Sequence, residues 1–149
     1  MRSHLSLSEY VKRRNGVAMG AKGSLRNMLS RALGAGSFPI FWHYWNPIWG
    51  YYLSRYVMEP SRFILPRWFA VICTFSVSGF LHDFAVSLVK WEIIFIFTPW
   101  FAGMGLLVIG SEYWRFSYHS KPWLVRALIN TFIIGSSFFI VKLIERYYF

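Results

Sequence analysis

Two polar side chains, His82 and Asn46, lie in apolar surroundings and are the residues most able to do chemistry. His82 falls within residues 68–89, an apolar run in which Cys73 and Asp83 are the other ionisable side chains. An ionisable residue inside a membrane span is costly to bury and usually serves a function. Neutral imidazole can take the proton of an attacking hydroxyl, and an amide can hold a substrate group or donate to an oxyanion. The pair predicts acyl transfer from an activated thioester to a hydroxyl in the lipid phase.

The residues around His82 predict the shape of its site. On a helix, Ser78 and Gly79 lie one turn before His82 and share its face. Their small size predicts either the wall of a narrow substrate channel or a face on which another helix packs closely. Asp83 points about 100° away from His82, so we expect it to meet a polar group on a neighbouring helix. The expected substrate-binding residues are Trp42, Trp45, Ser78 and Gly79.

Structural alternatives exist for the same residues. Asn46 precedes Pro47, where its amide could simply cap a turn. His82 could be a structural intramembrane histidine, and His43 is expected to contact lipid headgroups from an aromatic cluster. Cys73 is expected to be a small buried residue. The sequence has no Cys/His cluster, phosphate-binding loop or Ser-His-Asp order, so it predicts no metal and no covalently bound cofactor.

The elements that must position these residues are apolar helices. The chain has 149 residues, of which 56% are hydrophobic and 21% aromatic, and its single cysteine allows no internal disulfide. These features predict an all-α integral membrane protein. Its three transmembrane helices are expected over residues 68–89, 93–110 and 123–143. Residues 38–57, here called the aromatic segment, contain Pro39 and Pro47. This pattern predicts a re-entrant or interfacial segment.

Residues 1–37 form a basic region that we expect in the cytoplasm. Within it, Leu25, Leu29 and Leu33 recur at helical spacing and predict an amphipathic helix on anionic headgroups, ended by Gly34. The remaining residues, 38–149, are expected to form one membrane domain.

The basic residues also predict a topology. Of the 16 Lys+Arg residues, 13 lie in the N-terminal region, in the expected 55–67 and 111–122 loops or at Arg126. The other three are Lys90, Lys142 and Arg146. Cytoplasmic loops carry an excess of such residues. We therefore expect the N-terminus in the cytoplasm and the C-terminus on the opposite side of the membrane.

Two motifs resemble those of the membrane-bound O-acyltransferase superfamily. Phe41-Trp42-His43-Tyr44-Trp45-Asn46 resembles its aromatic-Trp-Asn motif. Ser78-Gly79-Phe80-Leu81-His82-Asp83-Phe84 resembles the Ser-Ala-Phe-Phe-His-Glu-Tyr motif of the sterol and diacylglycerol acyltransferase branch, and wax synthases are similar at both places. The resemblance implies that His82 is the catalytic base, with Asn46 near it in the membrane interior. It also implies acyl-CoA or another acyl thioester as co-substrate.

Members of that family usually have several hundred residues and more membrane helices, so the chain resembles only their C-terminal part. Two functions are consistent with this: an O-acyltransferase, alone or as part of a split enzyme, and a non-catalytic, acyltransferase-derived subunit that stabilises a larger membrane complex and binds lipid. Within a membrane, His82, Asp83 and Asn130 need polar partners, so we expect another membrane protein or a second copy of the chain. Membrane lipids are expected partners and nucleic acid is not, because the basic residues cluster on one membrane side.

Overall fold

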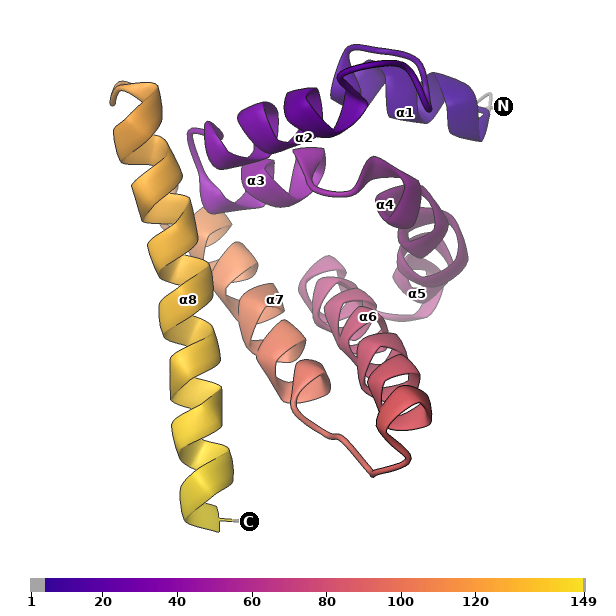
Figure 1. Ribbon diagram of the computed structural model, residues 1–149, viewed down its shortest axis with the longest axis vertical. Coiled ribbons are helices and arrows are strands. Elements are labelled where there is room, and N and C mark those ends of the chain that lie inside the picture. Colours follow the sequence, from indigo (N-terminus) through magenta and orange to yellow (C-terminus); the bar gives the residue numbers. More distant parts are fainter. Residues whose placement is uncertain (1–4, 149) are drawn as a thin grey trace.

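The computed structural model describes residues 5–148 as an assembly of helices, with no strand among them (Figure 1). The elements are α1 (Leu7–Asn15), α2 (Ser24–Leu33), α3 (Phe38–Tyr44), α4 (Pro47–Leu53), the π-helical turn η1 (Ser54–Met58), α5 (Glu59–Ile64), α6 (Arg67–Lys90), α7 (Phe97–Tyr113) and α8 (Trp123–Tyr148). The short helices α1–α3 lie across one end of the long helices, and α6 and α7 form an antiparallel hairpin. The all-helical prediction is confirmed.

Two helices, α6 and α8, are long and apolar enough to cross a membrane. They have 24 and 26 residues and coincide with two of the three predicted spans. The third expected span, residues 93–110, becomes α7, which begins only at Phe97 and has 17 residues. At about 1.5 Å per residue α7 is roughly 26 Å long, shorter than the ~30 Å hydrocarbon core. A third span therefore stays a prediction.

The late start of α7 has a specific cause in the carboxylate of Asp83 on α6. Its two oxygens accept hydrogen bonds from the backbone N–H groups of Ile96, Phe97 and Thr98 at 2.9, 2.8 and 2.7 Å, and from the Thr98 hydroxyl at 2.6 Å. The first N–H groups of a helix have no partner inside it, and Asp83 supplies one from the preceding helix. The polar partner expected for Asp83 on a neighbouring helix is confirmed.

Gly79 lies one turn before Asp83 and is buried against the same end of α7. A Cβ at this position would overlap the backbone of Phe97 and Thr98. Of the two expectations for this small residue, close helix packing is therefore the one that the structure shows. Asp83 and Gly79 together fix the α6–α7 hairpin at the level of His82.

The aromatic segment is mostly helical. Pro39 and Pro47 lie in the first turns of α3 and α4, where a missing N–H costs nothing, so they start helices instead of interrupting one. Asn46 turns the chain between the two helices with a left-handed backbone, φ 41°. Helical structure then continues through η1 and α5 to Ile64. Most of the connection expected over residues 55–67 is therefore helical, and its place on the cytoplasmic side stays a prediction.

The basic N-terminal region contributes two helices. The predicted amphipathic helix is confirmed as α2, which ends at Gly34. The sequence reasoning missed α1, whose start is fixed by a capping box between Ser6 and Glu9 and whose end is Gly16 at φ 81°. Both helices pack on the rest of the chain, α1 on α4 and α2 on α3 and α8.

A closed polar cluster, here called the Asn130 cluster, joins α2, α8 and the loop between α7 and α8. The Asn130 side chain is fully buried, and its Nδ2 donates to the carbonyl oxygens of Leu33 and Ala35 at 2.9 and 3.0 Å. Its Oδ1 accepts a hydrogen bond from the Tyr118 hydroxyl. Asn130 and Asp83 thus find polar partners inside the chain, and a complex with another membrane protein or a second copy stays a prediction.

Candidate functional site

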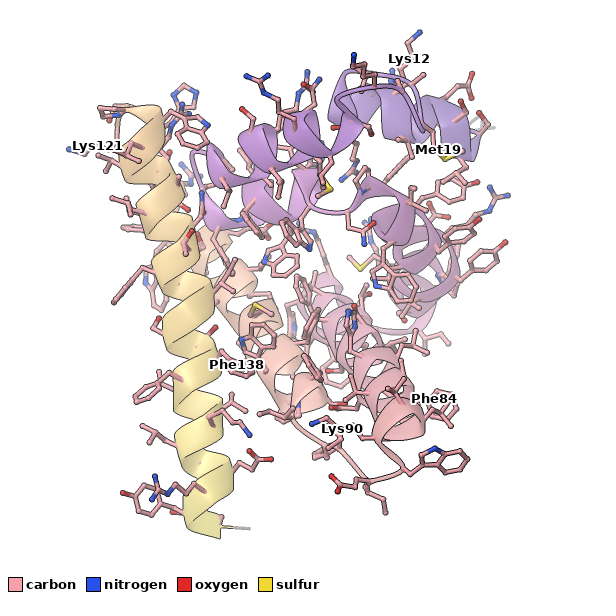
Figure 2. The ribbon with its side chains drawn as sticks, in the orientation of Figure 1. Lys12, Met19, Phe84, Lys90, Lys121 and Phe138 are labelled. Atoms are coloured by element: carbon pink, nitrogen blue, oxygen red, sulfur yellow. The ribbon has the colours of Figure 1, made fainter. Side chains whose placement is uncertain are left out.

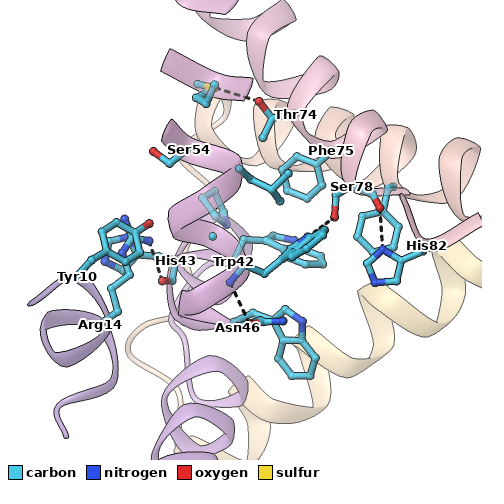
Figure 3. A pocket seen from close by; sticks show the side chains of 17 residues that line it. Tyr10, Arg14, Trp42, His43, Asn46, Ser54, Thr74, Phe75, Ser78 and His82 are labelled. Atoms are coloured by element: carbon cyan, nitrogen blue, oxygen red, sulfur yellow. Dashed lines mark hydrogen bonds between the residues drawn. The ribbon is translucent and has the colours of Figure 1, made fainter. Parts of the chain in front are cut away.

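A pocket of about 310 Å³ opens between α1, α3, α4, η1, α6 and α7 (Figure 3). We call it the His82 pocket; its lining includes Tyr10, Arg14, Trp42, His43, Trp45, Asn46, Trp49, Ser78, His82 and Phe101. Every site residue expected from the sequence lines it except Gly79, which faces α7. The structure thus brings together the two sequence motifs, which are separated by more than thirty residues.

The hydrogen bond of His82 determines which of its ring nitrogens can act as a base. Its Nδ1 lies 2.7 Å from the backbone carbonyl oxygen of Ser78, one turn earlier on α6. Because a carbonyl oxygen only accepts hydrogen bonds, Nδ1 of the neutral ring carries the proton. The lone pair is then on Nε2. The ring also stacks on Phe101, with centroids 5.1 Å apart and planes 29° apart, so packing limits its rotation.

Trp49 connects Asn46 to the turn of α6 that carries His82. Its backbone N–H donates to Asn46 Oδ1 at 3.2 Å, and its indole Nε1 donates to Ser78 Oγ at 2.9 Å. Its ring meets the His82 ring edge-on, with centroids 6.2 Å apart. We call Asn46, Trp49, Ser78 and His82 the open polar cluster. Sequence reasoning missed Trp49 as a site residue, although its position three residues after Asn46 is the one that an N-cap side chain bonds.

Asn46 has a structural function and a donor to spare. Its Oδ1 caps α4. This is the structural alternative that the place of Asn46 before Pro47 predicted. The side chain is nevertheless exposed, and no described residue accepts a hydrogen bond from its Nδ2. A substrate oxygen in the pocket could accept that bond without disturbing the cap.

Aromatic rings form the middle of the pocket. Trp42 packs edge-on against Phe75 and Phe41, with centroids 5.1 and 5.2 Å away, and Trp45 stacks on Phe41 at 5.4 Å. The Trp42 Nε1 atom is buried and donates to no described residue. Buried N–H groups without a partner are rare in native structures. This donor fits a pocket that takes a ligand with an acceptor atom.

The end of the pocket away from His82 is basic. The Arg14 guanidinium donates from Nη1 to the His43 carbonyl oxygen at 2.8 Å and lies 4.4 Å from the centroid of the Tyr10 ring. Burial lowers the pKa of Arg14, and burial together with the Arg14 charge lowers the pKa of His43. No local pattern pointed to Tyr10 and Arg14, because α1 reaches the pocket only through tertiary packing.

No protein-family model, curated protein or solved structure matches this chain. Within residues 5–148 there is also no group of three or more His, Cys, Asp or Glu side chains placed to hold a metal ion. The two sequence motifs and the geometry of the His82 pocket are therefore the observations that bear on function.

Proposed function

We propose that the protein is a membrane O-acyltransferase-like protein. It transfers an acyl group from acyl-CoA or a similar thioester to a hydroxyl of a lipid-phase acceptor, alone or as part of a split enzyme. The observation that carries the proposal is the orientation of His82, whose Nδ1 is bonded to Ser78 O and whose Nε2 is left as the base. The location of Asn46 in the same pocket supports it.

The proposed reaction uses no protein nucleophile, because the thioester is already activated. His82 Nε2 takes the proton of the acceptor hydroxyl as its oxygen attacks the thioester carbonyl carbon. The oxyanion that forms accepts a hydrogen bond from Asn46 Nδ2, or Asn46 holds the attacking hydroxyl instead. The C–S bond then breaks, and the leaving thiolate receives the proton from the imidazolium. The products are an ester and a free thiol.

Exposed apolar faces support the membrane part of the proposal. Phe80 and Phe84 on α6 and Phe132 and Phe139 on α8 are each more than half exposed. Apolar surface of this extent calls for a lipid or protein cover. We propose that α6 and α8 cross the membrane, with α7 as a third span.

The charge distribution supports the proposed orientation. Lys12 and Lys121 lie at the end formed by α1–α3, and Lys90 lies at the other end (Figure 2). We propose that the end with α1–α3 faces the cytoplasm and that the C-terminus lies on the opposite side. Labelling of cysteines introduced at Lys12 and Lys142 from outside intact cells tests this; only the cysteine at position 142 should react.

A second candidate function is a non-catalytic membrane subunit that packs against a larger complex. The observation that favours it is the open face of α8, together with the use of Asn46 Oδ1 as a helix cap. On this hypothesis the pocket holds lipid and no acyl transfer takes place.

Replacing His82 with alanine separates the two functions. In the purified full chain we expect His82→Ala to lower the rate of acyl transfer from a long-chain acyl-CoA to diacylglycerol or a fatty alcohol about 10²–10⁴-fold, because a general base is lost. Helical content should be unchanged. His119→Ala, at an exposed histidine outside the pocket, is the control. A wild-type chain that transfers no acyl group but co-purifies with a membrane complex, and a loss of thermal stability in His82→Ala, would support the subunit instead.

A further inference from the structure

The His82 pocket has two ends of different chemistry. Figure 3 shows Tyr10, Arg14 and His43 on one side, Ser78 and His82 on the other, and Trp42 between them. The reacting end is uncharged when the imidazole is neutral. The other end carries a permanent positive charge, since a guanidinium does not lose its proton in proteins.

The Arg14 guanidinium is held in place but not neutralised. Its position is set by the bond to the His43 carbonyl oxygen and by the face of the Tyr10 ring. The ion pairs among residues 5–148 join Arg67 to Glu112 and Lys142 to Glu145, and neither involves Arg14. A partly buried cation without a counter-charge is costly, so such a group is expected to meet an anion.

The acidic residue nearest in sequence does not provide that anion. The carboxylate of Glu9 on α1 accepts hydrogen bonds from the backbone N–H and the hydroxyl of Ser6. The carbonyl oxygen of Arg14 meanwhile accepts from the Arg31 guanidinium at 3.0 Å, which adds a second positive charge near this part of α1. The basic end of the pocket is therefore attractive to an anion from outside the chain.

We propose that Arg14 binds the phosphate group of a ligand whose remainder runs along the aromatic middle of the pocket towards His82. This inference rests on the proposed function and deepens it by naming a chemical class of ligand. A planar guanidinium can bond two phosphate oxygens at once, which a lysine cannot do. The volume of about 310 Å³ is at the lower limit of ligand pockets, enough for a polar headgroup and the first part of a chain. The phosphate belongs to a membrane phospholipid or to a soluble phosphate ester.

Native mass spectrometry of the full chain in mild detergent tests the proposal with two lipids that differ only in the phosphate. Phosphatidic acid should bind about tenfold or more tightly than diacylglycerol with the same acyl chains, as expected for charge-assisted hydrogen bonds. Arg14→Gln should remove most of this preference. Arg13→Gln is the matched control, because Arg13 is the exposed neighbour on α1 and does not line the pocket. The affinity of Arg13→Gln for phosphatidic acid should stay within about twofold of the wild-type affinity, as for a screened surface charge.

A third probe identifies the source of the phosphate. If glycerol 3-phosphate displaces phosphatidic acid in an Arg14-dependent way, the site takes a soluble phosphate ester; if it does not, the site takes the lipid headgroup. Both results support a phosphate site. Equal loss of affinity in Arg13→Gln and Arg14→Gln, or equal affinity for phosphatidic acid and diacylglycerol, would overturn the proposal by reducing the effect to a general basic surface.

Two further variants keep the test decisive. Should Arg14→Gln not fold, Arg14→Lys keeps the charge but loses the planar pair of donors, and its phosphatidic acid affinity should fall several-fold; unchanged affinity would contradict binding by two hydrogen bonds. His119→Ala, at an exposed histidine outside the pocket, should bind phosphatidic acid as the wild type does, and this binding is measured without a thioester, so that no turnover takes place. Binding and turnover are thus measured separately, so an inactive protein with an Arg14-dependent phosphate site refutes the proposed function and not this inference.

Discussion

The Asn130 cluster and the open polar cluster use the same type of residue for opposite purposes. Asn130 is fully buried, and both ends of its amide are bonded within the chain, to two carbonyl oxygens and a phenol hydroxyl. Asn46 is exposed, and only its oxygen is bonded, to the backbone of Trp49. His82 in the same cluster is also bonded at one ring nitrogen only. A satisfied cluster stabilises a fold, whereas a cluster with unused donors and acceptors can meet a substrate.

The position of the two clusters follows the same division. The Asn130 cluster lies where α2, α8 and the loop before α8 meet, and no residue of it lines the His82 pocket. The open polar cluster lies on the wall of that pocket. The asparagine that sequence reasoning singled out for chemistry is therefore the one that the fold leaves partly unbonded.

Removing the Asn130 side chain should have the largest effect on stability. Asn130→Ala leaves the carbonyl oxygens of Leu33 and Ala35 and the Tyr118 hydroxyl without their partner, which should lower the free energy of unfolding by about 3 kcal/mol. Asn46→Ala removes a helix cap and should cost only about 1 kcal/mol. Circular dichroism, used to monitor unfolding in detergent, measures both losses of free energy. Equal losses in the two variants would contradict a larger contribution to stability from the fully bonded Asn130 amide than from the Asn46 amide.

Changing Trp49 should affect activity more than stability. Trp49→Phe keeps an aromatic ring but removes the indole N–H bond to Ser78 Oγ, worth about 1 kcal/mol. The backbone carbonyl of the same Ser78 is bonded to His82 Nδ1. We therefore expect the rate of acyl transfer to fall about tenfold, a barrier change of about 1.4 kcal/mol. Trp114→Phe is the control, as Trp114 is exposed and does not line the pocket. Similar rates of acyl transfer in Trp49→Phe and in the control variant would show that the Trp49 hydrogen bond does not contribute to the reaction.

An effect confined to alkaline pH is expected in the Asn130 cluster. Burial raises the pKa of Tyr118 to about 12, from 10.0 in an unperturbed tyrosine. The unfolded chain therefore loses this proton first, and the contribution of Tyr118 is complete below about pH 10 and falls as the pH rises towards about 12. Tyr118→Phe should flatten this part of the profile of unfolding free energy against pH. An identical slope between about pH 10 and 11 in the two proteins would contradict the burial of the hydroxyl.

Local patterns were sufficient for the helices that depend on their own composition. Long, mostly apolar runs predicted α6 and α8, because a long apolar stretch has few alternatives to a helix. The spacing of Leu25, Leu29 and Leu33 predicted α2, because residues four apart lie on one face of a helix. The start of α1 was also readable, since Ser6 and Glu9 have the spacing of a capping box, but the sequence reasoning passed over it.

By itself, the sequence determined which side chains could do chemistry: His82 in an apolar helix, and Asn46 among aromatic rings before a proline. Only the tertiary structure decided how they are used. The donor from Trp49 reaches Ser78 across 29 residues, and Asp83 sets the start of α7 from 13 residues away. Arg14 enters the pocket because α1 packs on α4. Periodicity describes one element at a time, whereas a hydrogen bond between two elements depends on how both are packed, and that is why these three features could not be read from the chain alone.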